Sequence, residues 1–172
     1  MADQLAEFLN EFQRETDRAA AVLAAAYLDS RLEALLRAKF VAVPKFVEEL
    51  LTGQGGLSSF SARISVVYAV GLISLRAAED LHIVRRIRND FAHKLHGLSF
   101  NTPQIASYVS KFNILQALRN ERGEAFPLPT DSRTRFNFAV AVLLLNAVES
   151  RIRDMPKFQE ATGAAVIIGE QF

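Results

Sequence analysis

Apolar side chains recur every three or four residues along most of the chain, a spacing that predicts α-helices rather than β-strands. Leu5, Phe8, Leu9 and Phe12 begin the pattern in a stretch that covers residues 4–40. This stretch predicts one long helix or two helices arranged end to end. Later stretches predict further helices over residues 45–51, 60–70, 75–95, 103–112 and 132–153.

Serines and glycines mark where two of these helices begin and end. Ser58 or Ser59 is placed to cap the helix that starts at residue 60, and Ser74 is placed to cap the next one. A serine hydroxyl at this position accepts a hydrogen bond from a free amide of the first helical turn. Gly71 and Gly97 are expected to end the two helices, because glycine readily adopts the left-handed conformation found there.

The C-terminal helix, opened by Asp131 or Ser132, is expected to be the central and most buried one. Its residues 136–148 are apolar on nearly all sides, as in a helix surrounded by protein. The whole pattern predicts an all-α, single-domain, multi-helical bundle over residues 1–155, followed by a tail over residues 156–172. Within the tail, residues 164–168 predict a short strand or an extended arm packed on a partner.

Composition narrows the functions that this bundle can have. The 20 basic and 19 acidic side chains give a net charge of +1, so no overall field attracts nucleic acid or membranes. There is no cysteine, which excludes disulfides and cysteine-ligated metal sites. No apolar run reaches the roughly 20 residues that span a bilayer, and the start lacks the layout of a signal peptide. We therefore expect a cytoplasmic protein that has no membrane association.

A glycine-rich stretch at residues 53–56 raises the question of a nucleotide cofactor. A phosphate-binding Walker loop requires a Lys-Ser or Lys-Thr pair after its last glycine. Leu57-Ser58-Ser59 follows here instead. We therefore expect a flexible interhelical loop and no cofactor.

The segment from residue 82 to residue 96 is dense in polar side chains and contains all three histidines. At about 100° per residue, one narrow stripe of the predicted helix carries His82, Arg86, Asn89, His93 and His96. This polar stripe is either a solvated face or a surface for a partner, including a second copy of the chain. A metal site is disfavoured, because no third ligand lies at a suitable spacing from His93 and His96.

Within this segment, Arg88-Asn89-Asp90-Phe91-Ala92-His93 resembles the Arg-polar-x3-His pattern of HEPN-type helical domains. The resemblance implies RNA binding or RNA cleavage, in which Arg88 would stabilise phosphate charge and His93 would assist proton transfer. Residues five apart on one ideal helix point about 140° apart, which opposes this alternative. Otherwise Arg88 is expected to pair with a buried carboxylate, for which the candidates are Asp17, Asp29 and Asp80.

A second alternative is direct DNA binding through the helical hairpin at residues 60–90. Two helices around the turn at Gly71 have the outline of a helix-turn-helix. The leading turns of its second helix present Arg76, but also Glu79 and Asp80. Carboxylates that face phosphates are repelled, so an ordinary helical hairpin is favoured. Arg63 on the first helix is expected to form an ion pair across this hairpin with Asp80 or Glu79.

Residues 55–74, GGLSSFSARISVVYAVGLIS, resemble the signature of the mannitol operon repressor family. The matching positions are Gly56, Leu57, Ser61, Arg63, Ile64, Tyr68, Val70, Gly71, Leu72 and Ile73. This resemblance implies an all-helical cytoplasmic bacterial regulator, usually dimeric, that represses mannitol uptake and catabolism. It also implies a regulator without an evident standard DNA-binding motif.

The sequence therefore predicts a non-enzymatic, homodimeric repressor that acts through a regulatory protein partner and contacts DNA directly or indirectly. We expect neither a metal nor a cofactor. The alternative catalytic set is Arg88, Asn89 and His93. The predicted interaction surface consists of Arg63, His82, Arg85, Arg86, Arg88, Asn89, His93 and His96.

Overall fold

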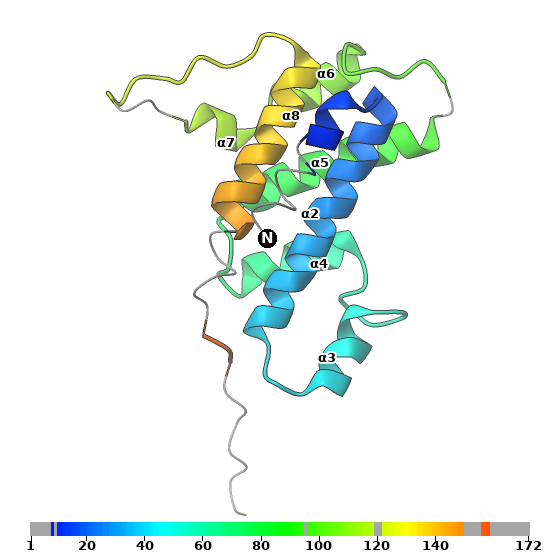
Figure 1. The fold of residues 1–172 in the computed structure, drawn as a ribbon, viewed down its shortest axis with the longest axis vertical. Helices are drawn as coiled ribbons and strands as arrows, with labels where there is room; N and C mark the ends of the chain where they lie inside the picture. Colours follow the sequence, from blue (N-terminus) through cyan, green and yellow to red (C-terminus); the bar gives the residue numbers. More distant parts are fainter. Residues whose placement is uncertain (1–7, 9, 95, 119–121, 150–155, 159–172) are drawn as a thin grey trace, which may run out of the picture.

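The computed structural model describes residues 8, 10–94, 96–118, 122–149 and 156–158, and these residues contain helices but no β-strand (Figure 1). The helices are α2 (Asp17–Lys39), α3 (Pro44–Leu51), α4 (Phe60–Ala69), α5 (Leu75–His93), α6 (Pro103–Val109), α7 (Asn113–Gln116), α8 (Ser132–Val142) and a π-helix, η1 (Leu143–Glu149). The prediction of an all-α fold is confirmed.

Local capping signals explain where several helices begin. The side chains of Ser59, Ser74 and Asp131 each accept a hydrogen bond from the backbone amide three residues later. Gly71, with a φ of 73°, follows α4, and the amide of Leu72 bonds back to the carbonyl of Val67 at 2.8 Å. These contacts confirm the predicted start of α4 and α5 and the predicted end of α4.

The N-terminal stretch forms two helical pieces, one of the two predicted forms. A helical turn at residues 10–14 ends before Thr16, whose hydroxyl caps α2. Residues 1–7 and 9 lie outside the described part of the chain.

The prediction that α5 ends at Gly97 is wrong, because the helix stops at His93. Arg18 of α2 donates hydrogen bonds to the carbonyls of Phe91 and Lys94. A cationic side chain thus satisfies free carbonyls at the end of α5, as is favourable at a helix C-terminus. This partner lies more than 70 residues away in the chain, so the local glycine was a misleading signal.

The helix predicted over residues 103–112 begins at Pro103 as expected but ends earlier, at Val109, and the sequence did not predict the short helix α7 that follows it. The carboxylate of Asp80 accepts hydrogen bonds from the amides of Asn113 and Ile114 at 2.8 and 2.7 Å. This buried side chain satisfies the first amides of α7, and so a new helix begins at Asn113.

The C-terminal helix is not the central one that the sequence predicted, because the most extensive contact between helices joins α2 and α5. It is nevertheless well buried, with Phe136, Ala139, Val140, Leu143, Leu144 and Val148 fully inaccessible to solvent. Its geometry changes from α to π after Val142, and Leu145 is 49% exposed. The predicted helix end near residue 153 and the apolar run at residues 164–168 lie outside the described residues.

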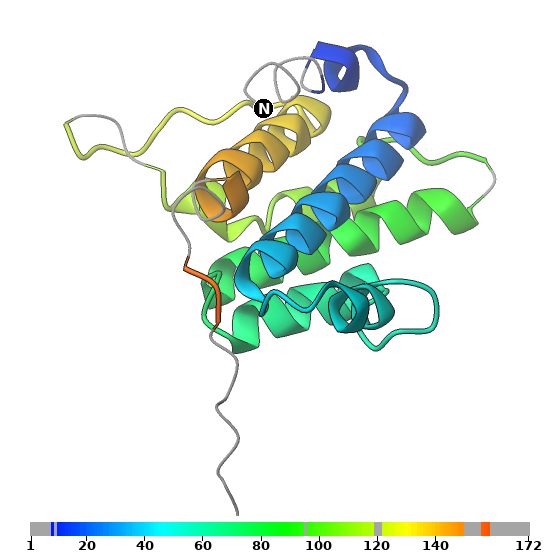
Figure 2. The same ribbon diagram turned by 60° about the horizontal axis from the view of Figure 1, so that its bottom comes forward.

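Helix α2 packs most extensively on α5 and also contacts α4 and η1, while α4 and α5 form an antiparallel hairpin (Figure 2). Five phenylalanines are among the largest fully buried side chains: Phe12, Phe91, Phe100, Phe112 and Phe136. Phe136 lies at their centre, 4.7 Å from Phe100 and 6.1 Å from Phe12 between ring centroids. Among the described helices, none is long and apolar enough to cross a membrane.

Candidate interaction surface

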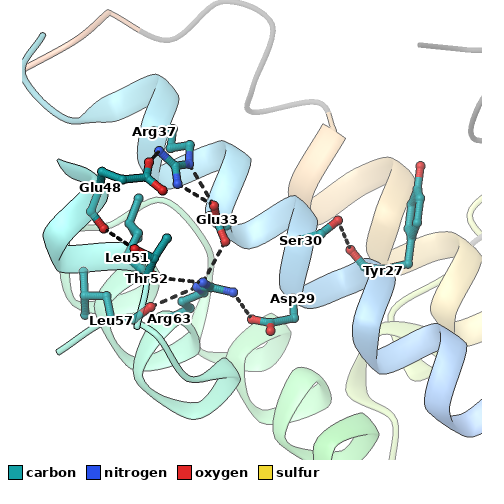
Figure 3. Close-up of polar contacts among 10 residues, drawn as sticks. All are labelled: Tyr27, Asp29, Ser30, Glu33, Arg37, Glu48, Leu51, Thr52, Leu57 and Arg63. Carbon is teal, nitrogen blue, oxygen red and sulfur yellow. Dashed lines mark hydrogen bonds and ion pairs between the residues drawn. The ribbon is translucent and has the colours of Figure 1, made fainter. Parts of the chain in front are cut away.

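Arg63 lies inside the protein, between α4, α2 and the end of α3 (Figure 3). Its guanidinium contacts Asp29 at 2.8 Å and Glu33 at 2.7 Å, both on α2. It also donates hydrogen bonds to the carbonyls of Leu51 and Leu57 at 2.9 Å each. The predicted pair with Asp80 or Glu79 is therefore wrong: α2, and not the hairpin partner α5, supplies the carboxylates.

The same ion pairs extend to α3 through a second arginine. Arg37 contacts Glu33 at 2.7 Å and Glu48 at 2.8 Å. We call Asp29, Glu33, Arg37, Glu48 and Arg63 the Arg63 cluster. Because Arg63 is only 6% exposed, it serves to join three helices and does not belong to an accessible surface, contrary to its place in the predicted set.

Two carboxyl groups near this hairpin have a pKa above the ordinary value. Burial raises the pKa of Asp29, and the hydrogen bond and charge of Arg63 only partly oppose it. Burial likewise raises the pKa of Asp80, against its hydrogen bonds from Asn113 and Ile114. The charge of Arg88 also lowers the pKa of Asp29, which is one of its three candidate partners.

The polar stripe runs along one side of α5 but divides into two environments. Arg86 is exposed and lies over the ring of Tyr108 on α6, with 5.3 Å from the guanidinium carbon to the ring centroid. His93 and His96 are also exposed, whereas Asn89 is half-buried. Within the predicted set, Arg86, His93 and His96 are thus the fully accessible members.

His82, at the start of the stripe, is half-buried, and its Nδ1 atom is buried without a hydrogen-bond partner among the described residues. Burial lowers the pKa of His82, and the charges of Arg85 and Arg86 lower it further. Arg85 is half-buried as well, and its Nε lacks a partner within the same part of the chain. These two side chains are therefore less suited to a surface contact than Arg86.

The geometry of α5 does not favour the catalytic alternative. The helix is continuous from Leu75 to His93, so Arg88 and His93 project about 140° apart around its axis. Arg88 is half-buried and its charge acts on Asp29 of α2, while His93 is exposed at the helix end. One chain alone therefore does not bring the two side chains onto a common substrate.

The first turns of α5 are engaged by α7, which bears on the DNA-binding alternative. Glu79 accepts a hydrogen bond from the side chain of Asn113 at 3.0 Å, and Asp80 caps α7. A recognition helix needs its leading residues free to enter the major groove. Here Leu75 and Arg76 are exposed, but the carboxylates of Glu79 and Asp80 follow them and contact α7.

An accessible apolar surface lies on α3, and sequence reasoning missed it. Phe46 is 70% exposed and Leu50 is 40% exposed. They border a hollow of about 250 Å³ whose other walls are Phe40, Val41, Val47 and Phe158. We call these six residues the α3 apolar patch. The spacing of Phe46 and Leu50, four apart on a short helix after Pro44, was a signal that could have indicated it.

The described part of the predicted tail, residues 156–158, reaches this patch. The amide of Phe158 donates to the carbonyl of Lys39 at 2.7 Å, and Lys157 Nζ donates to the carbonyl of Arg37 at 3.1 Å. Lys39 Nζ lies 4.5 Å from the centroid of the Phe158 ring. These contacts satisfy carbonyls at the end of α2 and place Phe158 in the wall of the patch.

Comparisons with known proteins agree with the resemblance seen in the sequence. Two curated relatives, the mannitol operon repressors of Escherichia coli strain K12 and of Escherichia coli O6:H1, are each 29% identical to this chain over 77 residues. This match covers 45% of this chain and 40% of each relative, so it spans less than half of their length.

A solved structure, the X-ray structure of the MtlR–HPr complex from Escherichia coli, has a similar fold. Its TM-score is 0.66 at 20% identity, and the match covers 86% of this chain and 97% of that one. The model of the family described as mannitol repressor matches residues 1–153. Since this match takes in nearly all of the sequence, the chain belongs to the mannitol repressor family.

Proposed function

We propose that this chain is a transcriptional repressor that acts by binding a protein partner. Two findings support the proposal: family membership, and the solved complex of a relative with HPr. The first turns of α5 are consistent with it, because they carry the carboxylates of Glu79 and Asp80, which contact α7 and would repel phosphates. In this proposal the protein has no enzymatic role, and its contact with DNA is indirect.

The observation that carries the proposal is the α3 apolar patch. Large apolar side chains that gather at an exposed, hollowed surface are typical of protein–protein contacts. Phe46 offers an aromatic ring that is 70% exposed, and aromatic rings are common among the residues that dominate binding energy. We propose that the partner places an apolar side chain into the hollow between Phe46 and Phe158.

The exposed part of the polar stripe is a second candidate surface. Arg86 is held in place over Tyr108, and exposed His93 lies on the same side of α5, while His96 is exposed in the segment after the helix. A positioned guanidinium is suited to a carboxylate or a phosphate on a partner. This surface keeps three members of the set that the sequence predicted.

One binding experiment distinguishes the two surfaces. The full chain is titrated with HPr from the same organism by calorimetry, using the variants Phe46→Ser and Arg86→Glu. The matched control is Val22→Ser, which removes an apolar side chain that is 41% exposed on α2. We expect Phe46→Ser to weaken binding by about tenfold or more, because a central aromatic residue contributes upwards of about 1.4 kcal/mol.

Each outcome of this titration has a clear meaning. Unchanged affinity in Phe46→Ser, with a loss in Arg86→Glu, moves the contact to the polar stripe. If neither wild-type protein nor variants bind HPr, and light scattering gives a dimer of the 19.1 kDa chain that Phe46→Ser dissociates, the patch is a homodimer contact instead. That result would support the predicted homodimer and overturn the docking of HPr there.

The mode of DNA contact is tested separately by fluorescence anisotropy on the DNA upstream of the chain's own operon. The proposal predicts no specific binding by the chain alone. Specific binding whose affinity falls steeply with salt would show direct phosphate contacts and would contradict repression through a partner.

A further inference from the structure

A second hollow lies at the other end of α2, between the N-terminal helical turn and the start of α8. Its volume is about 410 Å³, within the roughly 300–1,000 Å³ of pockets that hold small molecules. Its walls are Phe12, Gln13, Pro129, Arg133, Thr134, Asn137, Phe138 and Ala141. Both apolar and polar side chains therefore line it.

The charge in this hollow is already balanced. Arg133 contacts Asp17 at 3.0 Å and donates to the side-chain oxygen of Asn137 at 3.0 Å. It also donates to the carbonyls of Phe12 and Glu15, at 3.0 and 3.1 Å. An anion would have to compete with Asp17 and the two carbonyls, and a cation would be repelled by the guanidinium. The electrostatics therefore favour an uncharged ligand.

The other polar side chains that line the hollow can both donate and accept hydrogen bonds. Gln13 is exposed and makes no hydrogen bond with the described residues. Asn137 uses its oxygen for Arg133, which leaves its amide hydrogens to donate. Thr134 gives its hydroxyl hydrogen to Asp131 at 2.9 Å, which leaves the oxygen to accept. Hydroxyl groups match this mixture, because each one donates once and accepts twice.

The aromatic walls argue against a flat ligand such as a nucleobase. Phe12 stacks on Phe8 with 5.4 Å between ring centroids, and Phe138 stacks on Phe126 at 5.7 Å. Arg133 also lies over the ring of Phe12, at 5.8 Å. Other side chains of the protein therefore already cover much of the faces of these two rings. Carbon chains can still pack on these side chains, as in a molecule that alternates C–H and O–H groups.

From these contacts we infer that the hollow binds a small, uncharged, hydroxyl-rich molecule of the size of a hexitol or hexose. The site is distinct from the α3 apolar patch and does not depend on the proposed partner. A ligand here bridges the helical turn at residues 10–14 and α8. It therefore stabilises the folded chain in proportion to its occupancy.

The test is calorimetry and thermal unfolding of the full chain with mannitol, sorbitol or glucose, compared with mannitol 1-phosphate. We expect at least one of the three uncharged compounds to bind and to raise the midpoint of unfolding. We expect the phosphorylated compound to bind more weakly, because its charge has no free cationic partner. Concentrations up to about 10 mM cover dissociation constants near 1 mM.

Two variants locate the binding. Gln13→Ala is expected to weaken it about 2- to 12-fold, the value of one hydrogen bond. The variant should leave the fold intact, because this exposed side chain makes no hydrogen bond within the part of the chain that the structure describes. Ala141→Phe is expected to abolish binding by filling the hollow. Gln54→Ala, in the exposed loop after α3, is the matched control.

Three results would overturn the inference. The first is that none of the three uncharged compounds binds. The second is that mannitol 1-phosphate binds more tightly than mannitol. The third is that binding survives in both Gln13→Ala and Ala141→Phe, which would place it elsewhere on the protein.

Discussion

Two arginines far apart in the sequence make similar contacts with α2, one near the middle of the helix and one at its start. Arg63 binds Asp29 of α2 and the carbonyl that ends α3, while Arg133 binds Asp17 of α2 and carbonyls that end the preceding helical turn. In both places a cation satisfies a carboxylate and the negative end of a helix. The two sites differ in what surrounds them.

The Arg63 side chain is 7% exposed and its cluster is closed by α2, α3 and α4, whereas the Arg133 side chain is 17% exposed and borders a hollow of about 410 Å³. An arginine paired with a carboxylate and backbone carbonyls therefore holds helices together in one place and borders a candidate binding site in the other. What separates them is the space left beside the guanidinium, which the amino-acid type does not reveal.

The largest expected loss of stability follows from removing the guanidinium of the Arg63 cluster. Arg63→Ala leaves Asp29 and two carbonyls without their cation, while Glu33 keeps only Arg37, so we expect a loss of about 3 kcal/mol in the free energy of unfolding. Urea denaturation measures it. The matched control is Arg37→Ala, whose ion pairs are more exposed and whose expected loss is below about 1 kcal/mol. Similar losses in the two variants would contradict the structural role given to Arg63.

A smaller effect is expected at the open site. Arg133→Ala removes one ion pair and three hydrogen bonds, but water can reach the groups left behind through the hollow. We expect a loss of about 2 kcal/mol by the same measurement. A loss larger than that of Arg63→Ala would mean that the contacts of Arg133 stabilise the fold more than those of Arg63, which would contradict the comparison.

The residues that cap α4 and α8, which lie near Arg63 and Arg133 in the sequence, allow a further comparison of stability. Asp131→Ala at α8 and Ser59→Ala at α4 each remove one capping bond, so each should cost about 1 kcal/mol. Asp131→Asn should cost only a few tenths of that, because asparagine also caps. Hydrogen exchange of the first amides of each helix gives the local readout, and unchanged exchange at Thr134 in Asp131→Ala would refute the cap.

The smallest expected effect is the pH dependence of stability that His82 of α5 causes. The folded state lowers the pKa of His82 below its ordinary value of 6.5, so the unfolded chain takes up a proton first as the pH falls. Stability is therefore complete above pH 6.5 and declines as the pH falls through the lowered pKa. Urea denaturation at several pH values should show that His82→Gln flattens this decline, whereas His93→Gln at an exposed position should not. An equal pH dependence in wild type and His82→Gln would exclude His82 as the source.

Local signals in the sequence were sufficient to predict most of the helices and some of the residues at which they begin or end. Ser59, Ser74 and Asp131 cap the helices where their spacing predicted, because each cap involves residues only three apart. The end of α5 was mispredicted, since it depends on Arg18 from another helix. Periodicity thus predicts contacts within a helix but not those between helices.

The candidate site was less accessible to sequence reasoning for the same physical reason. Arg63 was expected to pair within its own hairpin, but Asp29 lies 34 residues away on α2. Of the predicted surface, Arg86, His93 and His96 are exposed, while Arg63 is buried. The α3 apolar patch depends on Phe158, whose position against Phe40 and Phe46 no local pattern encodes.

The contacts at the two ends of α2 also have a consequence for the order in which the protein is completed during synthesis. Arg133 holds the start of this helix, and residues 156–158 satisfy carbonyls at its end. Both groups leave the ribosome long after α2 itself. A nascent chain that reaches only to α7 already has the contacts of Arg18 with α5 at the start of α2, but it lacks those of Arg133 and of residues 156–158. The last quarter of translation therefore completes the contacts at both ends of the first long helix.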